Sequence, residues 1–227
     1  MALQSINIGS SANDGTGSTL RAAFDICNDN FTELYGGTTS ALGFKSEGTN
    51  FTGSLLIGHS TTGVISSAEN NTGIGISALD ALTEGDYNVA LGFEAATALT
   101  AGSFNVILGS RAGKALTTGI HNVAIGYAAL RTEDTGDKNV AVGYAALNAL
   151  NYDGDGYNVA IGHSAGLSVT TGTNNTIIGG LAGDALTTGY SNVAIGRNAL
   201  STEDTGRANT AVGYYALATQ NSDTANY

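Results

Sequence analysis

A serine and a histidine stand side by side in a pattern that hydrolases use. The stretch YNVAIGHSAG, residues 157–166, contains G-H-S-A-G, which matches the G-x-S-x-G motif of a nucleophile elbow around Ser164. In an elbow of this kind the serine attacks an acyl carbon, and an acid and then a histidine follow it in the chain. The histidines are His59, His121 and His163, so none of them follows Ser164. We therefore expect no catalytic role for Ser164 and no enzyme activity.

A second apparent motif is the stretch GSRAGKA at Gly109–Ala115, which has the composition of a phosphate-binding loop. It has three residues between the glycines where that loop has four, and alanine follows the lysine where serine or threonine would bind magnesium. The stretch therefore predicts no nucleotide site, and the sequence assigns no cofactor.

Acidic residues gather in three short segments that could offer carboxylates to calcium. These are TEDTG at 132–136 and at 202–206, and DGDGYN at 153–158. Their spacing matches no EF-hand loop. We expect solvated turns, with calcium binding as the alternative, and we assign no metal ligand.

All of these segments lie inside a repeat, and the repeat must position them. The asparagine of the NVAIG pattern recurs every 17 residues, apart from one step of 19 that contains NYDGDGYN. A degenerate copy begins at Ser54. The repeated asparagines are Asn71, Asn88, Asn105, Asn122, Asn139, Asn158, Asn175, Asn192 and Asn209.

Each copy predicts a short strand followed by a turn. The alternation Val89–Ala90–Leu91 has the period of two that marks a strand, the fourth residue after the asparagine is always glycine, and the seventh is nearly always alanine. Seventeen residues can hold two short strands and two turns, which predicts an all-β solenoid, or β-roll, of about ten coils. Strand spacing then gives a rod of roughly 45–50 Å, with the asparagines stacked in a hydrogen-bonded ladder.

A longer duplication supports a scaffold. Residues 113–147 match residues 183–217 at 25 of 35 positions. Copying a block of coils lengthens a rod without changing its cross-section, and this suits a structural protein better than an enzyme site.

Composition excludes several classes of protein. The chain has 227 residues, 33 of them glycine, no proline or tryptophan, and a formal net charge of −11. A chain with so few cations has no basic surface with which to replace the counterions of nucleic acid. No stretch approaches the 18 apolar residues of a membrane-spanning helix, and no secretory signal begins the sequence. We expect no nucleic-acid partner, no membrane insertion and stabilisation by backbone hydrogen bonds or by association.

The segment 18–36 differs from the repeats. Apolar side chains from Leu20 to Leu34 are spaced 4, 3, 4 and 3 residues apart, as in about two heptads of a coiled coil. A helix this short needs a partner, so it predicts a parallel homotrimer, and the alternative is a helix that caps its own solenoid. Cys27 lies on this seam, where we expect it to be buried as a small apolar residue.

Aromatic residues recur directly after the glycine of several copies, as at Phe93, Tyr127, Tyr144 and Tyr214. We expect them outside the small-residue core, either in contacts between chains or as exposed platforms for a sugar. Contact between chains is the preferred interpretation.

Two stretches resemble known families. The NVAIGYAAL-type repeats resemble the head repeats of trimeric autotransporter adhesins, which form a trimeric β-roll, and similar runs occur in bacteriophage tail-fibre and virion-fibre proteins. INIGSSANDGTGSTLRAAFDICNDNFTELYG looks like an N-terminal module of phage fibre proteins, particularly those of cyanobacterial phages. The resemblance implies a virion appendage, assembled in the host cytoplasm, that acts as a trimeric spacer or adhesion rod and contacts other virion proteins through residues 1–36.

The expected organisation follows from these observations. Residues 1–17 form an attachment arm, 18–36 the coiled-coil helix, 37–53 a transition, 54–220 the solenoid and 221–227 a polar tail. Contact with a glycan or protein of the host surface is a further expectation. The alternatives are a bacterial trimeric surface adhesin and, less favoured, a polysaccharide-degrading solenoid enzyme, which would need clustered carboxylates on one face.

Overall fold

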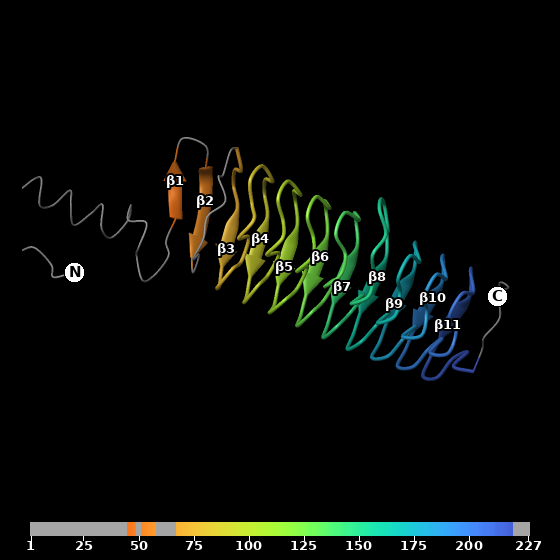
Figure 1. The fold of residues 1–227 in the computed structure, drawn as a ribbon. Coiled ribbons are helices and arrows are strands. Elements are labelled where there is room, and N and C mark those ends of the chain that lie inside the picture. The colour runs from red at the N-terminus through yellow and green to blue at the C-terminus, as the bar shows by residue number, and fades with distance from the viewer. Residues whose placement is uncertain (1–44, 49–50, 58–66, 220–227) are drawn as a thin grey trace, which may run out of the picture.

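The computed structural model describes residues 45–48, 51–57 and 67–219. Within these residues the chain is an all-β solenoid of stacked coils, as the repeat predicts, and the coils follow one another in a single row (Figure 1). The helix predicted for 18–36, with Cys27 on its seam, lies outside the described residues. So do the arm 1–17 and the tail 221–227.

One sheet holds all eleven strands in the order in which they occur in the chain. β1 pairs with β2 antiparallel, and each later pair is parallel. The strands are β1 (Lys45–Gly48), β2 (Phe51–Ile57), β3 (Thr72–Ile74), β4 (Val89–Leu91), β5 (Val106–Leu108), β6 (Val123–Ile125), β7 (Val140–Val142), β8 (Val159–Ile161), β9 (Thr176–Ile178), β10 (Val193–Ile195) and β11 (Thr210–Val212).

The parallel strands are in register with the repeat, so equivalent residues of successive copies stack into columns. Val89 pairs with Val106, and Val106 pairs with Val123. Positions are therefore counted from the repeated asparagine as position 0. The degenerate copy fits the same register, because Leu55 of β2 pairs with Thr72 of β3.

The core is narrow and is filled by a few positions of each coil. The middle strand residue, position +2, points inward and is buried, while its neighbours at +1 and +3 lie on the outer side. Positions +7, +8 and +11 supply the remaining buried alanine and leucine side chains. Four small columns can fill a cross-section of this size because each buried side chain packs against its equivalents one coil away.

Large and small side chains are exchanged within a coil so that the core keeps its volume. Most coils have alanine at +2, and several of these have leucine at +8, as at Leu130. Where +2 is Ile107, position +8 is Gly113, and a methyl group on that glycine would come within 3.2 Å of the isoleucine Cδ1. The same exchange occurs between Ile177 and Gly183. Close packing of the core explains why these sizes vary together.

The expectation of two strands in each coil is wrong for the described residues. Each coil there has one three-residue strand, and its second half is a series of turns. Positions +6 and +8 have left-handed φ angles, for example 55° at Ala128 and 50° at Leu130. This limb is still bonded from coil to coil, because the amide of Leu130 donates to the carbonyl of Ala146 at 3.0 Å. Left-handed φ angles prevent a strand, although the alternating sequence does not reveal them.

The predicted asparagine ladder runs through the inside of the solenoid. The side chain of Asn105 donates from Nδ2 to the carbonyl of Gly119 in its own coil at 2.9 Å and to Oδ1 of Asn88 at 3.0 Å. Oδ1 of Asn88 also accepts the backbone amide of Asn105 at 3.0 Å. The first rung uses serine, since Ser54 Oγ accepts the amide of Asn71 at 2.8 Å. The ladder thus satisfies buried backbone groups at one corner of each coil.

Glycine is required at position +4, where the strand ends. From Gly75 to Gly213 its φ lies between 126° and 141°, a region that other residues rarely adopt. At Gly126 a Cβ would also collide with the carbonyl oxygen of Gly143 in the next coil. Backbone therefore packs directly on backbone along this corner.

Candidate functional site

The structure brings Ser164 and His163 together. Ser164 Oγ lies 3.1 Å from Nδ1 of His163, and the serine side chain is buried. The histidine ring stacks on Tyr144 with a centroid distance of 4.9 Å. A catalytic histidine would need an acid to orient its other nitrogen, and no carboxylate contact to His163 occurs within the described part of the chain.

The amides around Ser164 are already used. The amide of Ser164 donates to the carbonyl of Tyr144 at 2.8 Å, that of Ala165 to Gly162 at 3.3 Å, and that of Gly166 to Ala182 at 2.9 Å. An oxyanion hole needs free amides aimed at the reacting oxygen. The serine is one variable residue of a coil, held in the same bonds as the equivalent residues of the other coils.

The loop-like stretch Gly109–Ala115 forms a small ion cluster. Lys114 Nζ lies 2.7 Å from Glu94 Oε2, and Arg111 Nε lies 3.1 Å from the same oxygen. The hydrogen bond from Lys114 is the largest cause that lowers the pKa of Glu94 below its ordinary value. The lysine that would contact a phosphate is thus paired with a carboxylate of the preceding coil.

The acidic segments are only partly solvated turns, which corrects the expectation for two of their residues. Glu133 and Glu203 are completely buried. Each occupies position +11, where the other described coils have leucine or valine. The surrounding letters are polar, so the local sequence suggests exposure, but the register places these two carboxylates in the core.

Glu133 is held by backbone amides. Its Oε1 accepts the amide of Gly136 at 2.7 Å, and its Oε2 accepts the amide of Tyr152 at 3.3 Å. In another coil the equivalent amide, that of Gly102, donates to Thr117 of the next coil at 3.3 Å. The next coil after Glu133 is the 19-residue coil, and here the carboxylate accepts the amide instead. Burial is the largest cause that raises the pKa of Glu133.

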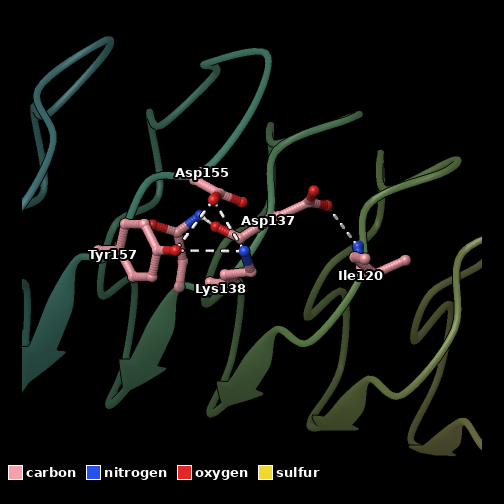
Figure 2. A network of polar contacts seen from close by, with 6 residues as sticks. Ile120, Asp137, Lys138, Asp155 and Tyr157 are labelled. Atoms are coloured by element: carbon pink, nitrogen blue, oxygen red, sulfur yellow. Dashed lines mark hydrogen bonds and ion pairs between the residues drawn. The ribbon is translucent and has the colours of Figure 1, made fainter.

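The two extra residues of the 19-residue coil belong to a polar network (Figure 2). Lys138 Nζ donates to Asp155 Oδ2 at 2.7 Å, and the Tyr157 hydroxyl donates to the same oxygen at 2.9 Å. Asp137 Oδ1 accepts the amide of Ile120 at 2.7 Å. These carboxylates are occupied by donors of the chain. Residues 45–48, 51–57 and 67–219 contain no group of three or more His, Cys, Asp and Glu that could hold a metal ion.

The largest unusual surface is the outer side of the sheet, here called the sheet face and defined as positions +1 and +3 of β3 to β11. Nine coils with two positions each give eighteen residues, and all of them are valine, threonine, isoleucine or leucine. Several are strongly exposed, for example Ile161 at 39% and Val212 at 65%. An apolar surface of this length marks an interaction site in a soluble protein. The strand pattern in the sequence already contains this signal, because both outward positions are apolar.

Two columns of larger side chains border the sheet face at the two ends of the strands. The first edge is position −1, and the second edge is position +5. The larger first-edge residues are Tyr87, Phe104, His121, Lys138 and Tyr157, and the larger second-edge residues are Ile76, Phe93, Tyr127, Tyr144, His163, Arg197 and Tyr214.

The rings along each edge stack on one another. Tyr87 and Phe104 are parallel with centroids 5.1 Å apart, and Tyr127 and Tyr144 are parallel at 5.3 Å. This arrangement weakens the expectation of a sugar platform, because a sugar packs on a ring face and the stacked rings cover each other's faces. The exposed edges of the rings remain available for contacts with another protein surface.

Comparisons with known proteins do not assign this chain to a family. No protein-family model, no curated protein and no solved structure matches it. Among the described residues, no helix has both the length and the apolar character needed to cross a membrane.

Proposed function

We propose that this chain is a structural rod of a virion fibre, a homotrimer that acts as a spacer or adhesion shaft on a phage tail or capsid. The observation that carries the proposal is the sheet face, an apolar surface that follows nine coils without a charged residue on a chain of net charge −11. Chains that expose such a surface are expected to associate along it. The resemblance of the repeats and of residues 1–36 to phage fibre proteins supports the same function.

The described interior supports a mechanical role. Each coil contacts only its neighbours, and the buried polar groups of the asparagine column bond to the adjacent coil. Stability in such a stack is a sum of coil and interface contributions, so length can vary while the cross-section is kept. This property suits a spacer, and residues 1–36 would connect it to other virion proteins.

Sedimentation tests the oligomeric rod. The full chain is expected to sediment as an elongated particle of three times 22.7 kDa. A compact monomer would contradict the proposal.

Localisation tests the fibre assignment independently. Gold-labelled antibody against this chain should decorate appendages on particles of the source phage in electron micrographs. Label on the surface of bacterial cells without particles would instead favour the adhesin alternative.

A further inference from the structure

We propose that the copies of this chain meet in register along the sheet face, with the first edge of one copy against the second edge of the next copy at the same coil. This inference rests on the proposed homotrimer and adds the surface and the register. The occupant of the sheet face is therefore a second copy of this chain, running parallel to the first.

The two edges carry complementary side chains, although they are too far apart to contact each other within one chain. Positions −1 and +5 are separated by six residues, which is about 15–20 Å in a chain that turns at both ends. In three successive coils one edge has a tyrosine ring and the other has a cation or an imidazole. The pairs are His121 with Tyr127, Lys138 with Tyr144, and Tyr157 with His163.

Other coils combine a large side chain on one edge with a small one on the other. The pairs are Phe104 with Ser110, and Ala208 with Tyr214. At the coil of β9 both edges are small, with Asn174 and Gly180. Complementary sizes and charges at the same coil are expected where two different edges meet, and a face that only contacts water does not require them.

Same-coil pairing selects the symmetry. In a two-fold dimer an edge meets its own copy or runs antiparallel, so residues of different coils face each other. In a cyclic assembly around an axis along the rod, the first edge of each copy meets the second edge of the next at one height. The pattern of pairs therefore favours a cyclic, parallel arrangement.

The width of the face favours three copies. Three faces of about 15–20 Å close into a triangular prism whose walls lie about 4–6 Å from the axis, while four faces would lie about 8–10 Å away. Sheets packed face to face are about 10 Å apart, or about 5 Å from each sheet to the midplane. Valine and isoleucine side chains can fill the triangular prism but not the square one.

The left-handed backbone at the first edge gives these side chains a fixed place. Residues at position −1 have φ near 55°, including Tyr87 at 55° and Phe104 at 61°, a conformation unusual for aromatic residues. Each is bonded to the preceding coil, as where the amide of Phe104 donates to the carbonyl of Asp86 at 2.9 Å. The ladder thus holds bulky side chains at a corner where glycine or asparagine would be easier.

Disulfide trapping tests the pairing. In a C27S background, the double variant His121→Cys with Tyr127→Cys should shift on oxidation from the single-chain band to a closed three-chain band. A register control combines His121→Cys with His163→Cys, whose coils are two strand spacings, about 10 Å, apart along the rod. That distance exceeds the roughly 7 Å that a disulfide can bridge, so the control should stay a single chain.

The outcomes separate the inference from the proposed function. A trimer in sedimentation whose same-coil pair does not cross-link, or whose control cross-links equally well, overturns the edge pairing and leaves the fibre proposal standing. Cross-linked dimers from His121→Cys alone would show a two-fold contact and overturn the pairing as well. A monomer in sedimentation overturns both. The exposed pair Tyr157→Cys with His163→Cys repeats the test one part of the rod away, in case the first variant does not fold.

Discussion

Removing one rung of the asparagine ladder should cost more than any single apolar contact of a coil. Asn122 Nδ2 donates to the carbonyl of Gly136 at 2.8 Å, and its Oδ1 accepts the backbone amide of Asn139 at 3.0 Å. Both groups belong to the buried corner of the solenoid. The variant Asn122→Ala leaves both without a partner and opens no path for water to reach them.

The size of the loss follows from the two orphaned groups. A buried donor or acceptor without a partner costs about 1–3 kcal/mol, so two cost about 2–6 kcal/mol of unfolding free energy. Asn122→Ser should recover about half, because a serine Oγ can accept the next amide but does not replace Nδ2. The chain already uses this solution at its first rung, where Ser54 accepts the amide of Asn71 at 2.8 Å.

Urea unfolding followed by circular dichroism, at one fixed protein concentration, measures these differences. Thr118→Ala is the matched control, since Thr118 lies exposed in the same coil and should change stability by less than about 0.5 kcal/mol. If Asn122→Ala unfolds within that margin of the natural chain, or if serine is no better than alanine, the ladder does not carry the stability assigned to it.

Three other changes test the remaining features. Gly126→Ala should prevent folding or lower the unfolding midpoint strongly, because φ is 126° and the Cβ would meet the Gly143 carbonyl, whereas Gly180→Ala, with its nearest atom at 3.9 Å, should be tolerated; equal solubility and midpoints would contradict this. Burial raises the pKa of Glu133, so the folded state binds its proton more tightly, and stability should fall as pH rises above the ordinary value of 4.5 through the folded pKa. Glu133→Gln should flatten that part of a thermal-stability profile, and an unchanged profile would show that another group titrates. Ser164→Ala should leave any background ester hydrolysis by the protein unchanged, and a large drop in rate would restore the nucleophile interpretation.

Much of the fold could be predicted because the repeat makes every local rule act many times. The strand at Val123–Ile125, the glycine that follows it and the stacking of Asn122 on Asn105 all follow from spacing and residue type. The sequence also indicated that Ser164 is a variable residue of a coil. Its contact with His163 was not predicted, but the amides around it are engaged in the coil's own bonds.

The tertiary structure decided the features that depend on a neighbour one coil away. Glu133 lies among polar letters, yet it is buried because register assigns it to the leucine column and because the next coil is two residues longer. Gly113 is small because Ile107 fills its space, which no window of the sequence shows. The left-handed turn limb likewise depends on hydrogen bonds to adjacent coils rather than on the residues that form it.

By itself, then, the sequence determined the period, the strand, the required glycines and the outward apolar positions, because each depends on local backbone geometry repeated along the chain. Only the tertiary structure decided which polar side chains are buried, which rings stack and which residues form the two edges of the sheet face. Those properties arise between coils 17 residues or more apart in the chain, where stacking rather than local preference sets the surroundings of each side chain.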